Sequence, residues 1–561
     1  MNSLKPMLLS SLKSYDKSRF FKDVTAGIIV AIIALPLSIA LALASGVGPE
    51  AGIFTAIVAG FVISALGGSS VQIAGPTAAF ATIVAGIVAH DGMDGLVVAT
   101  ILAGVFLILM GLCHFGSLIK FIPFTITTGF TSGIAVTIVI GQLKDFFGLT
   151  YPTGVKPIET VEKFETVIHN FSTMNMDAVI VGVVSLVILI IAPYIFKRIP
   201  GSLLAVIAGI LMVQFLPLKV NTIGNLYTIS NALPSLHFPS LSLNKIQNAL
   251  PNALTIAVLA AIESLLSCVV ADGMINGKHR SDMELVAQGA GNIASALFGG
   301  IPATGAIART AANIKNGGKT PIAGMVHSIT LVIVLVVLMP YAGMIPMPTI
   351  AAILFIVAYN MCQWRTFVNL AKTAPKSDII VLVTSFVLTV IFDLVVAIEV
   401  GMVLACLLFI KRMSEETKVN GWTYVDEDTL DVDEHLQKLP LQIRVYEISG
   451  PLFFGATSVI EEIVVKDFTT CLVLRMRSVP ALDSTALNAL KDLVQVCESK
   501  GITIVFSHVN DQPMKVMEKA GFIELVGEEN FQPSISAALD RAEEIVHSKQ
   551  EKTFSAKKSH V

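Results

Sequence analysis

Long runs of apolar residues, separated by short polar stretches, fill the first three quarters of the chain. The runs VTAGIIVAIIALPLSIALALASG and HSITLVIVLVVLMPYAGMI reach the roughly 20 apolar residues that a helix needs to cross about 30 Å of hydrocarbon. If some helices are short or broken, the pattern predicts about 14 membrane helices. They lie near residues 24–44, 51–66, 71–90, 94–113, 120–148, 176–197, 202–217, 249–273, 283–298, 304–314, 320–342, 347–361, 377–393 and 394–412. The chain is therefore predicted to be an α-helical polytopic membrane protein.

Basic residues between these segments indicate the orientation, because cytoplasmic loops carry an excess of Lys and Arg. With the N-terminus inside, the predicted inner loops contain Lys120, Lys197, Arg198, Lys278, Arg280, Lys315, Lys319, Arg365, Lys372, Lys376, Lys411 and Arg412. The predicted outer loops contain Lys144, Lys156, Lys163, Lys219 and Lys245. Residues 1–22 have no signal-peptide pattern and are predicted to remain as a cytoplasmic segment. We therefore expect both termini to lie in the cytoplasm.

The character of the chain changes near residue 413, after the predicted transmembrane transport domain of residues 23–412. Residues 413–438 are polar and acidic and are assigned as a linker. The strand-like runs LQIRVYEISGPLFF, TTCLVLRMRSV and GITIVFSHV then alternate with STALNALKDLVQVCESKG and DQPMKVMEKAGF, which have helical spacing. This alternation predicts a small cytoplasmic α/β domain over residues 439–546. Residues 547–561 are predicted to be a disordered tail.

The composition excludes several classes of protein. The 561 residues are 54% hydrophobic and 14% charged, with a mean hydropathy of +0.76, unlike a soluble globular protein. A net charge of -3 gives no support to a nucleic-acid-binding surface. The six cysteines show no C-x-x-C spacing and the histidines are scattered, so we expect reduced structural thiols and no metal site. No catalytic residue and no cofactor is indicated.

Two segments far apart in the chain resemble each other. ISALGGSSVQIAGPTAAFATI, near residue 63, and IASALFGGIPATGAIARTAANI, near residue 293, each end an apolar run and cross a short polar stretch into a new helix start. Paired interruptions of this kind in corresponding halves indicate a transporter built from inverted repeats with broken helices.

Each interruption predicts a helix N-terminus inside the membrane. Proline in Gly75-Pro76-Thr77 suits the first helical turn, and Ala303-Thr304-Gly305-Ala306 precedes the second start. A helix N-terminus carries about half a positive charge and free N–H groups, so two of them can hold an anion. Arg309, about one turn into the second helix, adds a full charge to this predicted site. The alternatives are that Arg309 reaches an interface or pairs with a buried acid.

Glu263 is the second ionisable residue whose place inside the membrane costs free energy. It lies in the middle of the span ALTIAVLAAIESLLSCVVADG. Ser267 lies four residues later on the same helical face, so its hydroxyl is predicted to orient a carboxyl that carries a proton. The alternative is a permanent ion pair with Arg309. Glu399 is interpreted as a rim or interhelical contact. Pro36 is expected to break the first span, and Ser38 to line the cavity.

At these residues the sequence resembles the SulP anion transporters, the bacterial relatives of the SLC26 family. The resemblance runs from about residue 20 into the C-terminal domain, through GPTAAF, GFTSGI, AIESLLSCVVADG, GKHRSDMELVAQGAGN and GGIPATGAIARTAANIKNGG. It implies a seven-plus-seven inverted-repeat fold of about 14 helices, in which a core domain moves against a gate domain, usually in a homodimer. It also implies a C-terminal STAS domain, which VPALDSTALNAL resembles. The resemblance further implies a place in the bacterial inner membrane, contacts with membrane lipids, and a cytoplasmic protein partner for the STAS domain.

Within the family the chain is most similar to the bacterial C4-dicarboxylic acid transporter branch, followed by the cyanobacterial bicarbonate transporters. LPLSIALA replaces the Pro-Gln pattern of sulfate-type members, and Glu263 stands where sodium-using bicarbonate members carry Asp. The second difference favours H+ as the coupling ion over Na+. The resemblance implies an anion site of Thr77, Ala78, Thr304, Gly305, Ala306 and Arg309, and a coupling site of Glu263 and Ser267.

We therefore predict a secondary active transporter, a proton symporter of a dicarboxylate, bicarbonate or sulfate. The alternatives are a sodium-coupled bicarbonate symporter, an uncoupled anion channel, and a membrane signalling protein acting through its STAS domain. For the last, Asp483-Ser484-Thr485 resembles the phosphoacceptor turn of bacterial anti-sigma antagonists. Ser484 is predicted to be a helix cap rather than a phosphorylation switch.

Overall fold

A computed structural model describes residues 4–117, 122–152, 154–155, 157–196, 200–239, 242–392, 394–422, 440–463 and 468–558. Contacts between residues divide the chain into two units, Met1–Val403 and Leu404–Val561. Lys120, Lys156, Lys197 and Arg198, which supported the predicted orientation, lie outside the described residues, as do most of the predicted linker and the end of the tail.

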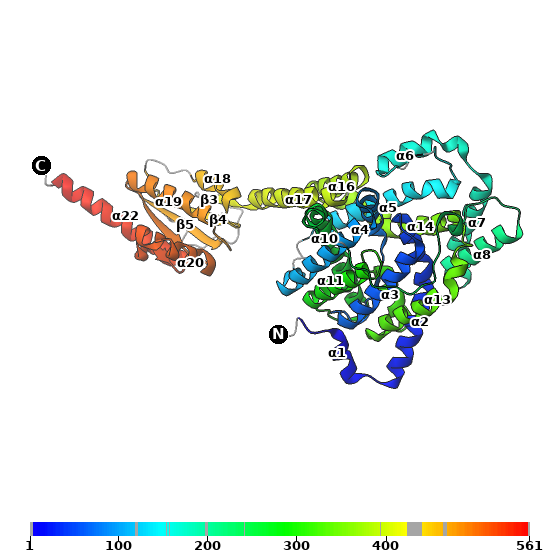
Figure 1. The fold of residues 1–561 in the computed structure, drawn as a ribbon. Helices are drawn as coiled ribbons and strands as arrows, with labels where there is room; N and C mark the ends of the chain where they lie inside the picture. The colour runs from blue at the N-terminus through cyan, green and yellow to red at the C-terminus, as the bar shows by residue number, and fades with distance from the viewer. Residues whose placement is uncertain are drawn as a thin grey trace. The chain divides into compact units, whose positions relative to one another are not determined.

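The first unit is almost entirely helical (Figure 1). Its longer helices are α2 (Lys17–Ala44), α3 (Pro49–Leu66), α4 (Ala78–Leu112), α5 (Phe124–Phe147), α7 (Met176–Ile195), α8 (Gly201–Phe215), α10 (Leu243–Ile275), α11 (Ser281–Leu297), α13 (Ile322–Ala342), α14 (Met347–Cys362) and α16 (Lys376–Ile391). Shorter helices are α1 (Met7–Ser11), α6 (Thr160–His169), α9 (Ile223–Leu226), α12 (Ile307–Lys315) and α15 (Trp364–Thr373), and α17 (Leu394–Glu416) continues into the second unit. Within the described residues, eight helices are long and apolar enough to cross a membrane.

Every predicted apolar segment coincides with a helix. The two segments near residues 71–90 and 94–113 form the two halves of α4, which are joined at Gly92 with φ 70° and ψ −173°. Pro36 was expected to break the first span, and this was wrong: α2 runs without interruption from Lys17 to Ala44. A proline removes one helical hydrogen bond, but its neighbours Ala34, Ser38 and Ile39 are buried, and their packing holds the helix together.

The helices of the first unit form two groups. In one group α11 packs against α3 and α4, α10 packs against α4, and α13 packs against α2 and α3. In the other group α5 packs against α14 and α16, and α7 packs against α8 and α14. This division follows the core and gate that the resemblance implies.

Two very short strands cross inside the first group. β1 (Ala74–Gly75) pairs antiparallel with β2 (Thr304–Gly305), so that Ala74 faces Gly305 and Gly75 faces Thr304. α4 starts just after β1, and α12 starts just after β2. The two interruptions found in the sequence therefore meet, and two helices begin at the crossing.

The second unit is built on one five-stranded sheet with the order β3-β4-β5-β6-β7. The strands are β3 (Lys418–Trp422), β4 (Ile443–Ser449), β5 (Cys471–Ser478), β6 (Thr503–Ser507) and β7 (Phe531–Gln532), and only the β3–β4 pair among them is antiparallel. The helices are α18 (Ser458–Glu461), α19 (Ser484–Ser499), α20 (Asp511–Lys519), α21 (Phe522–Val526) and α22 (Ile535–Lys558).

Alternate residues of β5 pack on the two faces of this sheet. Leu472 and Leu474 share a core with residues of α19, α20 and α21. Cys471 and Val473 share a second core with α22. This is the period of two that a strand covered on both faces requires.

α22 continues to Lys558, so the tail predicted as disordered from residue 547 is helical through most of its length. Lys549 supplies a reason, because its Nζ donates to the carbonyl of Gly501 at 2.7 Å and to Thr503 Oγ1 at 3.0 Å. These bonds extend the attachment of the helix beyond its buried residues Ile545 and Val546. β3 also begins inside the segment predicted to be a linker.

Candidate functional site

Hydrogen bonds hold the crossing of β1 and β2 to the first turns of α12. Ala306 N donates to the carbonyl of Ile73 at 2.9 Å, and Ile73 N donates to Thr310 Oγ1 at 3.1 Å. Asn313 Nδ2 donates to the carbonyl of Val71 at 2.8 Å. The chain before β1 is therefore fixed to the helix that carries Arg309.

Both helices that start at the crossing have open N-terminal ends. Thr77 is the N-cap of α4 and Ala306 is the N-cap of α12, and within the described residues neither end receives a side-chain cap. The positive ends of two helix dipoles are thus left for a ligand.

Arg309 is buried, with 1% of its surface exposed. Its Nη2 donates to Ser38 Oγ at 3.3 Å and to the carbonyl of Pro76 at 3.1 Å. Nε and Nη1 have no hydrogen-bond partner in the described part of the chain. Gly75 is required here, because a Cβ at this position would lie 2.2 Å from Arg309 Nη1. Ser38 was expected to line a cavity, and it instead holds the guanidinium.

The two alternative interpretations of Arg309 do not fit this geometry. A side chain with 1% exposure does not reach an interface. Among the described residues, no carboxylate oxygen forms an ion pair with Arg309, Glu263 included. Within the described residues, the guanidinium donates to one hydroxyl and one carbonyl, those of Ser38 and Pro76.

Glu263 of α10 lies next to the start of α4. Thr77 Oγ1 donates to Glu263 Oε2 at 2.8 Å. Ser267 was predicted to orient this carboxyl, but its hydroxyl donates to Thr310 Oγ1 at 3.5 Å instead. A residue four positions along the helix lies one turn away, and here that turn faces α12.

A cavity of about 320 Å³ brings most of the predicted site together. Of the predicted residues, Thr77, Ala78, Glu263, Gly305, Ala306 and Arg309 line it. Ser267 and Thr304 are buried outside the lining, and the Thr304 hydroxyl donates to the carbonyl of Ala260 at 3.2 Å. The opposite wall comes from α5 and α14 and adds polar groups that sequence reasoning missed, namely Thr127, Thr128, Thr131 and Asn360.

A second cavity, of about 270 Å³, lies further along the same helices. On α4 the lining passes from Ala78 in the first cavity to Thr82 in the second, and on α10 from Ile262 to Thr255. At 1.5 Å per residue these steps are about 6 Å and about 10 Å. A barrier of one to two helical turns therefore separates the two spaces.

The family follows from comparison with known proteins. The model of the Sulfate permease family matches residues 20–385, which is more than half of the chain. This chain belongs to the sulfate permease family. A STAS domain matches residues 438–538.

Relatives in this family are transporters, not enzymes. The chain is 39% identical over 533 residues to YvdB of Bacillus subtilis (strain 168), whose name proposes a sulfate transporter, with 92% of this chain and 97% of that protein covered. It is 30% identical over 537 residues to the bicarbonate transporter BicA of Picosynechococcus sp. (strain ATCC 27264 / PCC 7002 / PR-6), with 93% of this chain and 94% of that protein covered.

Solved structures agree with this fold. The structure of SLC26A9 matches with a TM-score of 0.86 at 19% identity and covers 98% of this chain and 94% of that chain, which shows a likeness of fold. The transmembrane domain of the cyanobacterial BicA matches with a TM-score of 0.63 at 30% identity and covers 68% of this chain and 98% of that chain.

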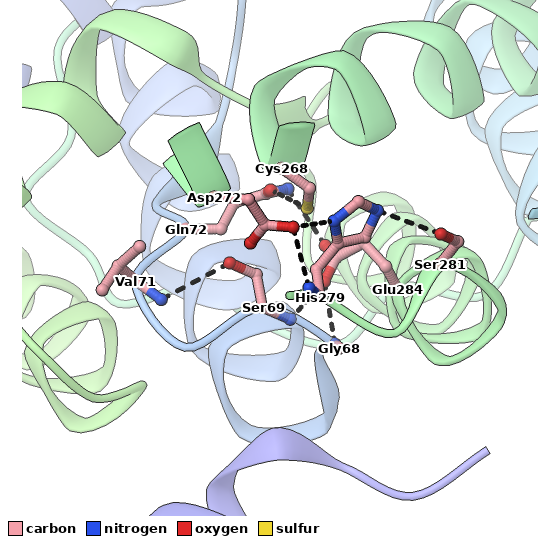
Figure 2. A network of polar contacts seen from close by, with 9 residues as sticks. All are labelled: Gly68, Ser69, Val71, Gln72, Cys268, Asp272, His279, Ser281 and Glu284. Carbon is pink, nitrogen blue, oxygen red and sulfur yellow. Dashed lines mark hydrogen bonds and ion pairs between the residues drawn. The ribbon is translucent and has the colours of Figure 1, made fainter. Parts of the chain in front are cut away.

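A network of polar contacts holds the segment before β1 in place (Figure 2). Glu284 of α11 accepts hydrogen bonds from the backbone N–H groups of Gly68 and Ser69, at 2.8 Å and 3.2 Å, and from Gln72 Nε2 at 3.0 Å. Gln72 in turn accepts a hydrogen bond from Cys268 and lies against Gly305, where a Cβ would meet Gln72 Nε2 at 1.9 Å. The buried carboxylate thus holds the turn before β1 and, through Gln72, the position of β2.

The same network continues along the end of α10 (Figure 2). Asp272 Oδ2 lies 2.7 Å from His279 Nδ1, and His279 Nε2 lies 3.0 Å from Ser281 Oγ. No role was predicted for these residues. The signal for His279 and Ser281 was the polar run GKHRSD, which stands between the predicted helices near residues 249–273 and 283–298.

Two further predicted residues lie away from the cavity. Glu399 of α17 is exposed and borders a separate space lined by residues of α4 and α10, which fits a rim position. In the STAS domain, Asp483 and not Ser484 is the N-cap of α19: Asp483 Oδ1 accepts from Ala486 N at 2.8 Å, and Oδ2 accepts from Phe454 N at 2.9 Å. Ser484 is exposed at the next position, so its predicted capping role was wrong.

Proposed function

We propose that this member of the sulfate permease family is a secondary active transporter that moves a small anion together with a proton, with Glu263 as the proton carrier. The observation that carries the proposal is the contact between Thr77 and Glu263. This contact joins a carboxyl to the open N-terminus of α4, in a cavity that also contains Arg309.

The charges of the site support coupling. An anion at the two helix ends and Arg309 would repel an ionised Glu263, since both negative charges share one cavity. Protonation of Glu263 removes this repulsion. Binding of the anion and binding of the proton therefore favour each other, which is the linkage that symport needs.

The arrangement of the cavities supports movement of the anion across a barrier. The crossing belongs to the first helix group, whereas Thr128 and Asn360 belong to the second. Sliding of the first group along α5 by about the distance between the cavities, 6–10 Å by helix rise, would carry the site from one space toward the other.

Three anions are the candidates for transport. The relatives' names support sulfate and bicarbonate, and the resemblance to the C4-dicarboxylate branch supports a dicarboxylate. We further propose a homodimer in the bacterial inner membrane with both termini in the cytoplasm, and a STAS domain that binds a cytoplasmic protein.

The test is uptake by the purified full chain in liposomes. Labelled sulfate, bicarbonate and a C4-dicarboxylate are each supplied with an inward proton gradient, an inward sodium gradient, or neither. We expect one anion to accumulate with the proton gradient. Accumulation driven by sodium alone would refute proton coupling, and fast equilibration with no accumulation under any gradient would identify a channel.

A further inference from the structure

The residues before α2 form a short amphipathic segment that has no place in the proposed transport step. α1 and the 3-10 turn that follows it (Leu12–Ser14) put Leu9, Leu12 and Lys13 on one face, because residues three and four positions apart are neighbours on a helix. All three side chains are exposed, Leu9 at 51% and Leu12 at 49%. A face that combines leucine with lysine is typical of a helix lying in the interface of a membrane.

Hydrogen bonds attach the other side of this segment to the first helix group. Met7 N donates to the carbonyl of Gly67, just after α3, at 2.8 Å. Arg280, just before α11, donates through Nη1 to the carbonyl of Lys5 at 2.7 Å and through Nη2 to Ser10 Oγ at 2.9 Å. The segment is therefore fixed to two helices of this group, with Leu9 and Leu12 left on its outer face.

The same arginine links the segment to the crossing of β1 and β2. Arg280 N donates to the carbonyl of Gly68 at 3.0 Å. Gly68 N donates to Glu284 Oε2 at 2.8 Å, and Gln72 Nε2 donates to Oε1 of the same carboxylate at 3.0 Å. Gln72 lies against Gly305 of β2. A continuous chain of contacts thus leads from the segment to the crossing.

The two ends of the segment place it at the surface of the membrane. Asp16 is the N-cap of α2 and Gly67 is the C-cap of α3, and both helices are long and apolar enough to cross a membrane. A segment that runs from the start of one span to the end of another lies where both spans leave the hydrocarbon. Its charge suits an anionic surface, because residues 1–22 include five basic residues and one acidic residue, Asp16.

We propose that residues 4–14 bind the anionic lipids of the cytoplasmic leaflet and that this contact steadies the crossing through Arg280. Leu9 and Leu12 enter the boundary between headgroups and acyl chains, and Lys13 lies among the phosphates. The lipid surface then holds the segment and, with it, the turn before β1. A crossing that is held in place before the anion arrives binds the anion at a lower entropic cost. The lipid contact rests on the proposed cytoplasmic N-terminus, and its effect on the crossing rests on the proposed anion site.

The lipid contact is tested by hydrogen exchange on the full chain in two kinds of vesicle, one of phosphatidylcholine alone and one of phosphatidylcholine mixed with phosphatidylglycerol. We expect the amides of residues 4–14 to exchange about tenfold more slowly in the anionic vesicles. The double variant Leu9→Ser, Leu12→Ser and the single variant Lys13→Glu should each lose most of this difference. Leu525→Ser, at an exposed leucine of the STAS domain, is the matched control and should keep it. Equal exchange in both vesicles would overturn the proposal and leave the outer face to a protein partner.

The effect on the crossing is tested by calorimetry with sulfate and bicarbonate in the same vesicles. We expect the native chain to bind its anion about threefold or more tightly in the anionic vesicles, and Arg280→Ala to remove this difference while residues 4–14 remain protected by the lipid. An affinity that is equal in both vesicles would overturn the link through Arg280. If the segment responds to the lipid but neither vesicle shows anion binding, the lipid contact stands and the proposed anion site is wrong. Arg280→Lys replaces Arg280→Ala if the alanine variant does not fold.

Discussion

Arg309 shows how one side chain is kept charged inside an apolar helix bundle. An arginine at the centre of a bilayer costs roughly 2.5 to 3.5 kcal/mol on insertion scales, and no carboxylate among the described residues pairs with it. Ser38 Oγ and the carbonyl of Pro76 hold one end of the fork. Nε and Nη1 have no hydrogen-bond partner among the described residues. A binding role explains this placement better than a structural one.

Replacing Arg309 should therefore affect binding more than folding. We expect Arg309→Ala to weaken anion binding by at least about tenfold, or about 1.4 kcal/mol, with normal abundance in the membrane. Lys315→Ala is the matched control, because Lys315 is an exposed cation in the last turn of the same helix. Calorimetry with sulfate and bicarbonate checks both variants. Binding within about twofold of the native chain would make Arg309 structural.

A substitution of Glu263 tests proton coupling separately from anion binding. Glu263→Gln resembles the protonated carboxyl in size and can still accept from Thr77. We expect the variant to bind anion and exchange labelled anion, yet to lose accumulation driven by an inward proton gradient, because the site no longer carries a proton. Glu399 is a second carboxyl in an apolar helix, and the Glu399→Gln variant should accumulate the anion as the native chain does. If Glu263→Gln still concentrates the anion under a pH gradient alone, the proton carrier lies elsewhere.

At the scale of elements, the crossing of β1 and β2 is what converts two helix starts into one site. The two strands contribute four residues, Ala74, Gly75, Thr304 and Gly305, and two of these are glycines that lie against the side chains of Arg309 and Gln72. Close approach of the backbone therefore matters more here than the hydrogen bonds of such a short ladder.

Gly75→Ala should disrupt this approach. The new methyl group would meet Arg309 Nη1 at 2.2 Å, so the guanidinium would have to leave its position in the cavity lining. We expect a loss of about 1–3 kcal/mol in stability, typical of overpacking, together with weakened anion binding. Gly86→Ala is the control, because a Cβ on Gly86 in α4 meets nothing within 4 Å. A Gly75→Ala variant with native melting temperature and native affinity would contradict this account of the crossing.

The cap of α19 gives a prediction for the STAS domain. Asp483→Ala should lower the stability of this domain by about 1 kcal/mol, the usual cost of losing an N-cap, and should expose the amides of Ala486 and Phe454. Ser484→Ala should change little, because Ser484 is exposed and Asp483 supplies the cap. Hydrogen exchange followed by mass spectrometry on the full chain measures both variants. Equal protection of these amides in Asp483→Ala and the native chain would refute the capping role.

The sequence predicted the helices and the two helix starts inside the membrane better than the side-chain contacts. Apolar runs are local patterns, and so is the similarity between the segments around Gly75 and Gly305. These patterns predicted the positions of the helices and of both helix starts. The partner of Glu263 was predicted one turn away, at Ser267, whereas the actual donor is Thr77, a residue almost two hundred positions earlier. Helical spacing identifies residues on one face, but it does not say which neighbouring helix that face meets. The Glu284 network was missed for the same reason, since it joins segments that are far apart in the chain.

At the scale of the whole molecule, transport needs access to one site from two sides in turn. Asn360 lines the cavity that contains Glu263 and Arg309, and Gly86 lines the second cavity. A probe at each position would therefore measure the accessibility of one cavity. Neither position belongs to the residues proposed to bind the anion or the proton.

Cysteines at these two positions test alternating access. In a full chain whose exposed cysteines Cys113 and Cys406 are replaced by serine, we expect Asn360→Cys and Gly86→Cys to react with a membrane-impermeant thiol reagent added from opposite sides of the vesicle. A saturating transported anion shifts the population between the two conformations, so it should raise the reaction rate at one position and lower it at the other. Reaction rates are measured by mass spectrometry, with a non-transported anion as the control. A channel would leave both positions reactive at once and would show no opposed change in rate, because its pathway is open to both sides without a moving barrier.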